Sequence, residues 1–382
     1  MKMNEIKRII LITHNDLSVQ AGNVTLICRR AEAMYDMFDI KTECIVTHPF
    51  PLPKHLVNGM DFKVLETNKS ILHEINLFDP DMIVIYGISS FSKIDTIRKV
   101  GYQGEIYLDV QGAPEEMIDF KKGIDRFKEY PKFFIKKLML KSALKKANGA
   151  FVVTDELKNY CIDLSKNEQK CRYIKIRCGL QNTLDIDTKI YFRNKYRKLL
   201  GIKDKDITFV FSGYRKPWQK IDEIIEIFKK IDATIHNAYF CFFCNLDEQF
   251  EKMLEIKFPK CNYCARLLSF SEYYEYLCAC DVGFLVRDYL TTNKVAFPNK
   301  FSDYLTSGLL ITMNDAISEP FRIAEKYKFP IINCNNWNSP EFIVNIRQLS
   351  NIRFADLNNY YEKCDLICDE ELSYQKQINK QL

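Results

Sequence analysis

The sequence lacks an apolar run long enough to cross a lipid bilayer. Its longest runs, for example residues 207–211, have the length of one β-strand, whereas a membrane-spanning helix needs about 20 apolar residues. Residues 9–12, after a basic start, are too few for the core of a signal peptide, and no small-residue cleavage site follows them. We therefore expect a cytoplasmic protein.

The chain also lacks a strong net charge. Its 55 Lys and Arg residues against 50 Asp and Glu residues leave +5, which is too little to indicate a nucleic-acid partner. Hydrophobic residues make up 47% of the 382 residues. The chain can therefore bury substantial cores, and it is long enough for two or three domains.

Histidine is scarce, and no nucleophile–base constellation is visible. The five histidines, which form no spaced cluster, are His14, His48, His55, His73 and His236. No Asp-x-Asp motif precedes a small strand in the manner of a metal site, and residues 185–187 (DID) are interpreted as solvated linker.

Fourteen cysteines are present, but they lack the regular spacing of a disulfide framework. Two Cys-x-x-Cys pairs, at 241–244 and 261–264, match the spacing of a zinc ribbon. Both pairs lie in strand-like runs without a nearby glycine, and residues i and i+3 of a strand point to opposite faces. We expect core cysteines there and no metal site.

Strand-like and helix-like segments alternate along the chain. In the first half the predicted strands are residues 8–13, 42–47, 62–65, 82–86, 105–109, 150–154 and 173–177. In the second half they are residues 208–212, 239–243, 263–268, 282–286, 309–312 and 330–333. Two such series imply two Rossmann-like α/β domains, each a doubly wound parallel sheet, facing each other across a cleft.

The break between the domains is expected within residues 179–201, a polar stretch without clear periodicity. We predict an N-terminal domain at 1–185, a C-terminal domain at 186–355, and a helix at 356–382 that returns to the first domain. Open α/β sheets bind ligands at the carboxyl ends of their strands, so functional residues are expected directly after strands.

The first segment of this kind is residues 209–220 (FVFSGYRKPWQK). Gly213 follows the predicted strand and allows a close turn, and Arg215, Lys216 and Lys220 precede the next helix. Amide donors, cations and a helix N-terminus favour an anion such as a phosphate. The alternative is a solvated basic turn at a strand exit.

The second segment is residues 284–312. It carries Arg287 and Lys300, followed by a short predicted helix that contains Asp303 and ends at Gly308, a residue type that commonly terminates helices. A carboxylate at this position can accept both hydroxyls of a ribose. The alternative is an acid that only complements the helix dipole.

Residues 293–312 (NKVAFPNKFSDYLTSGLLIT) resemble the pattern N-(K/R)-V-A-x-P-x-K-F-x-(E/D)-Y-L-x-x-G-L of family 4 glycosyltransferases, which have the GT-B fold. Residues 109–116 (DVQGAPEE), 177–180, 209–219 and 269–288 resemble further segments of the branch found in bacterial capsule and surface-polysaccharide clusters. The resemblance implies a retaining transferase that moves a sugar from a nucleotide diphosphate donor, expected to be a UDP-sugar, to a hydroxyl of a glycan, glycolipid or glycoprotein. It implies no metal and no other cofactor.

The resemblance also implies site residues. Asp303 matches the second acid of the family's E-x7-E motif and is expected on the ribose, whereas the first acid falls on Val295. Gly213 and Gln219 stand where many members carry Arg and Lys. The predicted catalytic cations are Arg215, Lys216 and Lys300, and the predicted donor-binding residues are Gly213, Lys220, Leu268, Arg287, Asn293, Pro298, Asn299 and Asp303.

The first domain is expected to bind the acceptor. His14 ends its first predicted strand, Gly22 and Asn23 precede its first helix, and Gln111 stands where relatives often have His. The predicted acceptor-binding residues are therefore His14, Gly22, Asn23, Gln111 and Gly112. An ordinary loop histidine and a plain helix start are the alternatives.

Residues 121–146 carry ten Lys or Arg residues against Asp125 and Glu129, a local charge of +8, with aromatic and apolar residues between them. Such a segment can lie on an anionic membrane surface, which suits a lipid-linked acceptor at the inner face of the cell membrane. The alternative is a solvated helix whose apolar stripe packs on the first domain. The hypothesis of RNA binding has less support, because no RNA-binding motif accompanies the charge.

Two other functions remain open. A non-catalytic GT-B subunit that supports a partner transferase is consistent with the missing first acid. A sugar-nucleotide epimerase would need acid and base side chains in the cleft, and the sequence does not show them.

Overall fold

The computed structural model describes residues 5–17, 22–51, 57–166, 171–180, 182–258 and 262–381. The chain divides into two compact units. Unit 1 comprises residues 1–181, 290–297 and 372–382, and unit 2 comprises residues 182–289 and 298–371. Among the described helices, none is both long enough and apolar enough to span a membrane.

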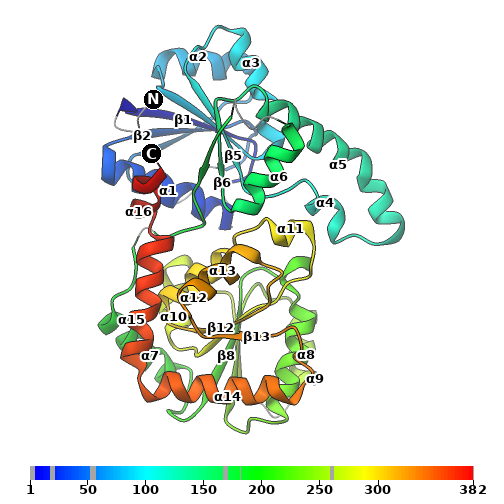
Figure 1. The fold of residues 1–382 in the computed structure, drawn as a ribbon, viewed down its shortest axis with the longest axis vertical. Helices are drawn as coiled ribbons and strands as arrows, with labels where there is room; N and C mark the ends of the chain where they lie inside the picture. Colours follow the sequence, from blue (N-terminus) through cyan, green and yellow to red (C-terminus); the bar gives the residue numbers. More distant parts are fainter. Residues whose placement is uncertain are drawn as a thin grey trace. The chain divides into compact units, whose positions relative to one another are not determined.

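Unit 1 is built on a seven-stranded sheet in the order β3-β2-β1-β4-β5-β6-β7, with every neighbouring pair parallel (Figure 1). Its strands are β1 (Arg8–Thr13), β2 (Lys41–Val46), β3 (Met60–Val64), β4 (Met82–Tyr86), β5 (Glu105–Val110), β6 (Gly149–Val152) and β7 (Arg172–Lys175). Its helical elements are α1 (Gly22–Phe38), α2 (Asn68–Phe78), η2 (Ile88–Ser90), α3 (Lys93–Lys99), α4 (Glu116–Asp119), α5 (Gly123–Leu144), α6 (Asp155–Ser165), α11 (Thr291–Lys294) and α16 (Tyr374–Gln381).

Unit 2 contains a six-stranded parallel sheet in the order β10-β9-β8-β11-β12-β13. Its strands are β8 (Ile207–Ser212), β9 (Ala238–Phe243), β10 (Asn262–Arg266), β11 (Val282–Leu285), β12 (Leu310–Met313) and β13 (Ile331–Asn333). Its helical elements are α7 (Ile186–Leu199), η3 (Pro217–Gln219), α8 (Ile221–Asp232), α9 (Glu248–Lys257), α10 (Phe270–Cys278), α12 (Asn299–Thr306), α13 (Ser318–Lys326), α14 (Pro340–Ala355) and α15 (Leu357–Ile367), after which η4 (Cys368–Leu372) leads back to unit 1.

The predicted fold class is confirmed. All thirteen predicted strands are present, and none of their bounds differs by more than two residues from the prediction. In each unit the first six strands follow the order 3-2-1-4-5-6 of a doubly wound dinucleotide-binding fold. The strands were recognisable because central parallel strands are buried on both faces and therefore read as apolar runs, as in β4 (MIVIY) and β8 (ITFVFS).

The terminal helix α16 belongs to unit 1 although it is encoded at the far end of the chain. Its Tyr374 and Ile378 are buried in one cluster with Ile9 of β1 and Ala33 of α1. The predicted bounds 1–185, 186–355 and 356–382, with acceptor and donor roles for the two domains, stay a prediction.

The prediction that residues 179–201 lack periodic structure is wrong, because α7 occupies Ile186–Leu199. Asp185, interpreted as linker, is its N-cap and accepts a hydrogen bond from Thr188 N at 2.7 Å. The helix buries Lys189, Arg193 and Arg197, which are spaced by four residues. The periodicity escaped notice because the interior-facing side chains are basic instead of apolar.

Two of these basic residues, Arg193 and Arg197, meet a single buried carboxylate, Asp281, directly before β11, whereas Lys189 pairs with Asp365. Arg193 and Arg197 of α7 lie 2.7 and 3.3 Å from its oxygens, and Arg353 of α14 lies at 2.7 Å. Burial alone would raise the pKa of Asp281, but the charges of Arg193, Arg353 and Arg197 outweigh burial and lower the pKa below its usual value. Asp281 thus joins α7, α14 and the sheet.

Three cysteines of the two Cys-x-x-Cys pairs lie on or directly after two neighbouring strands. Cys241 of β9 and Cys264 of β10 are register partners, and Cys244 is buried directly after β9. Burial raises the pKa of the Cys244 thiol to about 12. Cys261 lies outside the described residues.

Replacing Asp281 should destabilise the protein strongly. Asp281→Asn leaves three buried guanidinium groups without their carboxylate, so we expect the free energy of unfolding at pH 7 to fall by about 3–5 kcal/mol. The lowered pKa of Asp281 means that its contribution is present above the unfolded value near pH 4 and is lost as the pH falls through the folded pKa. Denaturant unfolding between pH 3 and 7 measures both effects.

The control is Glu248→Gln, which removes one partner of an exposed ion pair with Lys252 and should change stability by less than about 0.5 kcal/mol. An equally small effect of Asp281→Asn would contradict the structural role of Asp281.

Candidate functional site in unit 2

Three segments meet at the carboxyl edge of the unit 2 sheet. β8 and β11 are parallel neighbours, so the turn after Ser212 and the loop after Leu285 emerge side by side. Lys300 lies in the first turn of α12. Its side chain reaches the turn after β8, because Lys300 Cε lies close to Gly213. This edge is where doubly wound sheets hold their ligands.

Lys300 is a buried lysine at this edge. Its Nζ lies 4.1 Å from the centre of the Phe211 ring, and within the described residues it has no hydrogen-bond partner. Gly213 has a φ of +95°, and a β-carbon at this position would lie 3.2 Å from Lys300 Cε. Gly213 therefore permits both the left-handed backbone conformation of the turn and the close approach of the Lys300 side chain.

Arg287 is a second buried cation at the same edge. Its guanidinium donates to Val286 O and to Gln219 Oε1, both at 2.9 Å. In the part of the chain that the structure describes, no carboxylate lies within ion-pair distance of Arg287 or Lys300. Neither of these basic side chains therefore has an acidic partner among the described residues.

The pKa values of both cations follow from this environment. Burial lowers the pKa of Arg287 to about 10. Burial, and secondly the charge of Arg287, lowers the pKa of Lys300 well below its usual value, although Cys244 and Asp303 act in the opposite direction. An anion bound between the two cations would stabilise both charged forms.

Asp303 lies one helical turn beyond Lys300. Its Oδ1 accepts a hydrogen bond of 2.7 Å from the hydroxyl of Tyr274. Beside it, the hydroxyls of Tyr273 and Tyr304 lie 2.9 and 3.1 Å from Ser212 Oγ. Sequence reasoning missed Tyr273 and Tyr274, although the run SEYYEYL (residues 271–277) within α10 was a visible signal.

Two of the predicted cations are engaged elsewhere. Lys220 forms ion pairs of 2.5 Å with Asp288 and 2.6 Å with Glu223. Arg215 pairs with Asp247 and stacks on the ring of Phe250, with its guanidinium carbon 4.3 Å from the ring centre.

The remaining predicted donor residues are distributed around this site. Lys216 is exposed, Leu268 follows β10 and is half-buried, and Pro298 and Asn299 form the N-cap and first residue of α12. Asn293 is instead part of α11 in unit 1. The structure thus brings together Gly213, Arg287, Lys300 and Asp303.

The segment around Asn293 is held within unit 1 by specific hydrogen bonds. Thr292 donates to Asp119 Oδ2 from its amide at 3.0 Å and from its hydroxyl at 2.7 Å. Thr154 Oγ1 donates to Val295 O at 2.8 Å. Val295 stands at the position of the first acid in the family 4 pattern. It is buried, and it takes part in these hydrogen bonds through its carbonyl oxygen.

The carboxyl edge of the unit 1 sheet carries the predicted acceptor residues. His14 Nδ1 lies 3.1 Å from Thr47 Oγ1, and the rings of His14 and His48 meet edge to face at 5.2 Å. Gln111 donates to Asp109, which forms a buried ion pair with Arg30 at 2.7 Å.

The structure gives fewer contacts for the other predicted acceptor-binding residues. A β-carbon at Gly112 would meet nothing within 4 Å. Gly22 is the first residue of α1, and the side chain of Asn23 lies outside the described part of the structure. His48 was not predicted, and its position two residues after β2 was the available signal.

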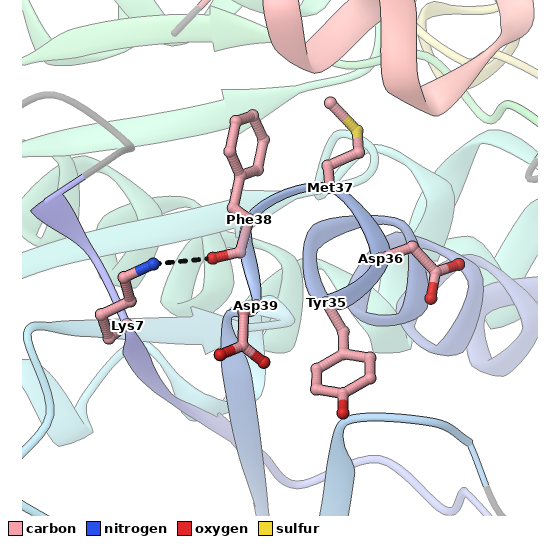
Figure 2. A pocket seen from close by; sticks show the side chains of 6 residues that line it. All are labelled: Lys7, Tyr35, Asp36, Met37, Phe38 and Asp39. Carbon is pink, nitrogen blue, oxygen red and sulfur yellow. Dashed lines mark hydrogen bonds between the residues drawn. The ribbon is translucent and has the colours of Figure 1, made fainter.

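A surface hollow of about 650 Å³ in unit 1 lies at the opposite edge of that sheet. Figure 2 shows the side chains around it, and Lys7 Nζ donates to Phe38 O at 3.0 Å. Lys7 precedes β1 and Asp39 precedes β2, so the hollow lies at the amino ends of the strands. It is therefore not the ligand edge of this fold.

No known protein family and no curated protein matches this sequence. Among solved structures, a sucrose-phosphate synthase from Thermosynechococcus elongatus superposes with a TM-score of 0.71 and 12% identity, over 98% of this chain and 97% of that chain. Alr3699/HepE from Anabaena, in complex with UDP and glucose, gives 0.64 and 10% over 99% and 98%. An E. coli trehalose-6-phosphate protein bound with UDP-2-fluoro glucose gives 0.64 and 10% over 98% of both chains.

These neighbours are GT-B glycosyltransferases. At such low identity the likeness establishes the fold. The chain has the GT-B fold, as the sequence resemblance implied.

Replacing Lys300 by an apolar residue should not destabilise the protein. Lys300→Met removes an uncompensated buried charge and keeps most of the side-chain volume, so we expect the free energy of unfolding at pH 7 to stay constant or rise by about 0.5–2 kcal/mol. Because the pKa of Lys300 is lowered on folding, the wild type gains stability as the pH rises toward the usual lysine value near 10.5. The variant should lack this gain.

Lys252→Met, at an exposed position of α9, is the matched control and should behave like the wild type. A loss of stability in Lys300→Met similar to that of a core substitution would show that Lys300 has a compensating partner in the folded protein.

Proposed function

We propose that this protein is a retaining glycosyltransferase, related to the family 4 branch of bacterial surface-polysaccharide assembly, that uses a UDP-sugar donor. The observation that carries the proposal is a pair of buried basic side chains, Arg287 and Lys300, at the ligand edge of a GT-B unit, with no ion-pair partner among the described residues. A diphosphate supplies the negative charge that this pair lacks.

The pair also accounts for the departures from the family pattern. Gly213 and Gln219 stand where many members carry Arg and Lys, and in space Gly213 adjoins Lys300 while Gln219 accepts from Arg287. We propose that the two cations have moved to other backbone positions around the same diphosphate. The N-terminus of α12, with its helix dipole, would add a further attraction for the diphosphate.

Asp303 is the proposed ribose ligand. Tyr274 donates to its Oδ1, which orients the carboxylate, and the ribose hydroxyls would donate to the same carboxylate. Leu268, beyond the end of β10, is the proposed neighbour of the base. The acceptor is proposed to bind unit 1 at His14, Gly22, Asn23, Gln111 and Gly112, and to be a glycan or a lipid-linked glycan.

In the proposed front-face reaction the bond between the sugar and the diphosphate breaks while the acceptor oxygen bonds to the same face of the sugar. The departing diphosphate takes the acceptor's proton, and Lys300 and Arg287 stabilise its growing charge. A cation about 4 Å from a phosphate oxygen gains about 4 kcal/mol at an effective dielectric of 20. This is a useful part of the 8–23 kcal/mol that enzymes generally supply, and no metal is needed.

Binding of UDP should take up protons through Lys300. The phosphate raises the lowered pKa of this lysine, so calorimetry over a series of pH values below the usual lysine pKa, in buffers of different ionisation enthalpy, should show net proton uptake by the wild type. Lys300→Met should bind UDP at least tenfold more weakly and without this uptake, and Lys252→Met should match the wild type. Absence of UDP binding to the wild type would remove the proposed donor.

Transfer should proceed with retention and without added metal. Product NMR after incubation with an α-linked UDP-sugar and a suitable acceptor should show an α-linkage, and EDTA should leave the rate unchanged. Asp303→Ala should reduce kcat/KM by at least tenfold because the ribose loses its anchor. UDP binding without hydrolysis or transfer would favour the non-catalytic subunit, and a product with inverted sugar stereochemistry at a ring carbon would indicate an epimerase.

A further inference from the structure

Helix α5 exposes an unusual amount of apolar surface. Five large apolar side chains are more than half exposed, namely Ile124 (71%), Phe127 (74%), Phe134 (55%), Ile135 (58%) and Leu138 (63%). With about 3.6 residues per helical turn, these positions, together with Pro131, fall within an arc of about 100°. They form one continuous stripe, here called the α5 stripe, along most of the helix.

The α5 stripe is not the face by which the helix packs on unit 1. The buried residues of α5 are Phe133, Leu140, Ala143 and Leu144, which lie on the opposite side of the helix by the same spacing. That side contacts α4, α6 and η2. The helix therefore has two apolar faces, and unit 1 uses one of them. Figure 1 shows α5 at the margin of unit 1, with its N-terminal part extending away from the sheet.

Lysines flank the α5 stripe on both sides. Lys128 and Lys132 follow one margin and Lys141 follows the other by helical spacing. Lys132 lies 3.6 Å from Glu129, whereas no carboxylate of the described residues pairs with Lys128 or Lys141. An apolar stripe between basic margins is the pattern of a helix that lies in a lipid headgroup layer.

Charge and shape together favour an anionic lipid surface over other occupants. A second copy of α5 would bring two rows of lysines against each other, and like charges repel. A nucleic acid would neutralise the lysines but leave the five apolar side chains in contact with water or phosphate. A bilayer of anionic lipids satisfies both features, because the acyl chains bury the apolar side chains and the anionic headgroups attract the ammonium groups.

We propose that the α5 stripe docks unit 1 on an anionic membrane, with Phe127, Phe134 and Leu138 inserted between the headgroups and with the flanking lysines on lipid phosphates. The helix lies in the plane of the interface and does not cross the bilayer. This docking does not depend on the proposed sugar transfer. If both hold, the membrane brings unit 1 to lipid-linked acceptors.

Vesicle flotation of the full chain tests the proposal. The wild type should float with vesicles of phosphatidylcholine and phosphatidylglycerol at low salt, should float much less with pure phosphatidylcholine, and should be released by high salt. The double variant Phe127→Ser/Leu138→Ser should bind at least tenfold more weakly. Because both side chains are exposed, its thermal unfolding should match the wild type.

Two further variants sharpen the result. The control, Leu77→Ser/Ile256→Ser, removes two exposed apolar side chains from α2 and α9 and should float like the wild type. In Phe127→Trp, vesicles should shift the added tryptophan emission to shorter wavelength, as expected for a ring that enters the lipid.

Three results would overturn the proposal. They are failure of the wild type to float at low salt, equal flotation of Phe127→Ser/Leu138→Ser, and a concentration-dependent dimer in light scattering that this double variant abolishes. The last result would assign the stripe to a second copy of the chain. None of these outcomes depends on UDP binding, so the proposed transferase activity is tested separately.

Discussion

The organisation of unit 2 depends on how its buried charges are balanced at the two edges of one sheet. At the amino edge, Asp281 receives Arg193, Arg197 and Arg353 from two helices, and it also accepts the amide of Thr208 at the start of β8 at 2.8 Å. Backbone carbonyls accept the remaining guanidinium hydrogens, for example Gly308 O from Arg353 at 2.9 and 3.0 Å. A buried carboxylate is tolerated because every charge around it has partners.

The carboxyl edge of the same sheet is balanced differently. Arg287 and Lys300 are also buried, but among the residues that the structure describes no carboxylate forms an ion pair with either of them, and the nearby Asp303 accepts a hydrogen bond from Tyr274. Such an arrangement costs stability, and natural proteins accept that cost mainly where a ligand completes the site. The other buried charged side chains described in this unit have hydrogen-bond or ion-pair partners, and this difference between the two edges is the strongest structural reason to propose a polyanionic ligand there.

The strands could be predicted from the sequence, but the side-chain contacts between residues far apart in the sequence could not. Apolar runs predicted all thirteen strands, but α7 escaped because Lys189, Arg193 and Arg197 point inward where apolar residues are usual. Likewise, the cation candidates looked equivalent in sequence. Lys220 also pairs with the nearby Glu223, but Asp247 and Asp288, which pair with Arg215 and Lys220, lie 32 and 68 residues away from them. Pairing over such separations is a property of the tertiary structure.

The basic helix α5 is a second case in which the sequence could not predict tertiary packing. Periodicity predicted an amphipathic helix at 121–146 but could not tell a packing stripe from a free apolar face, and the folded unit shows that α5 has both. A second apolar face costs solubility, so it needs a use. Docking on lipid offers one that fits the proposed chemistry, because an enzyme confined to a membrane meets lipid-linked acceptors at a high effective concentration. Unit 1 could then bind each acceptor weakly and release the product readily.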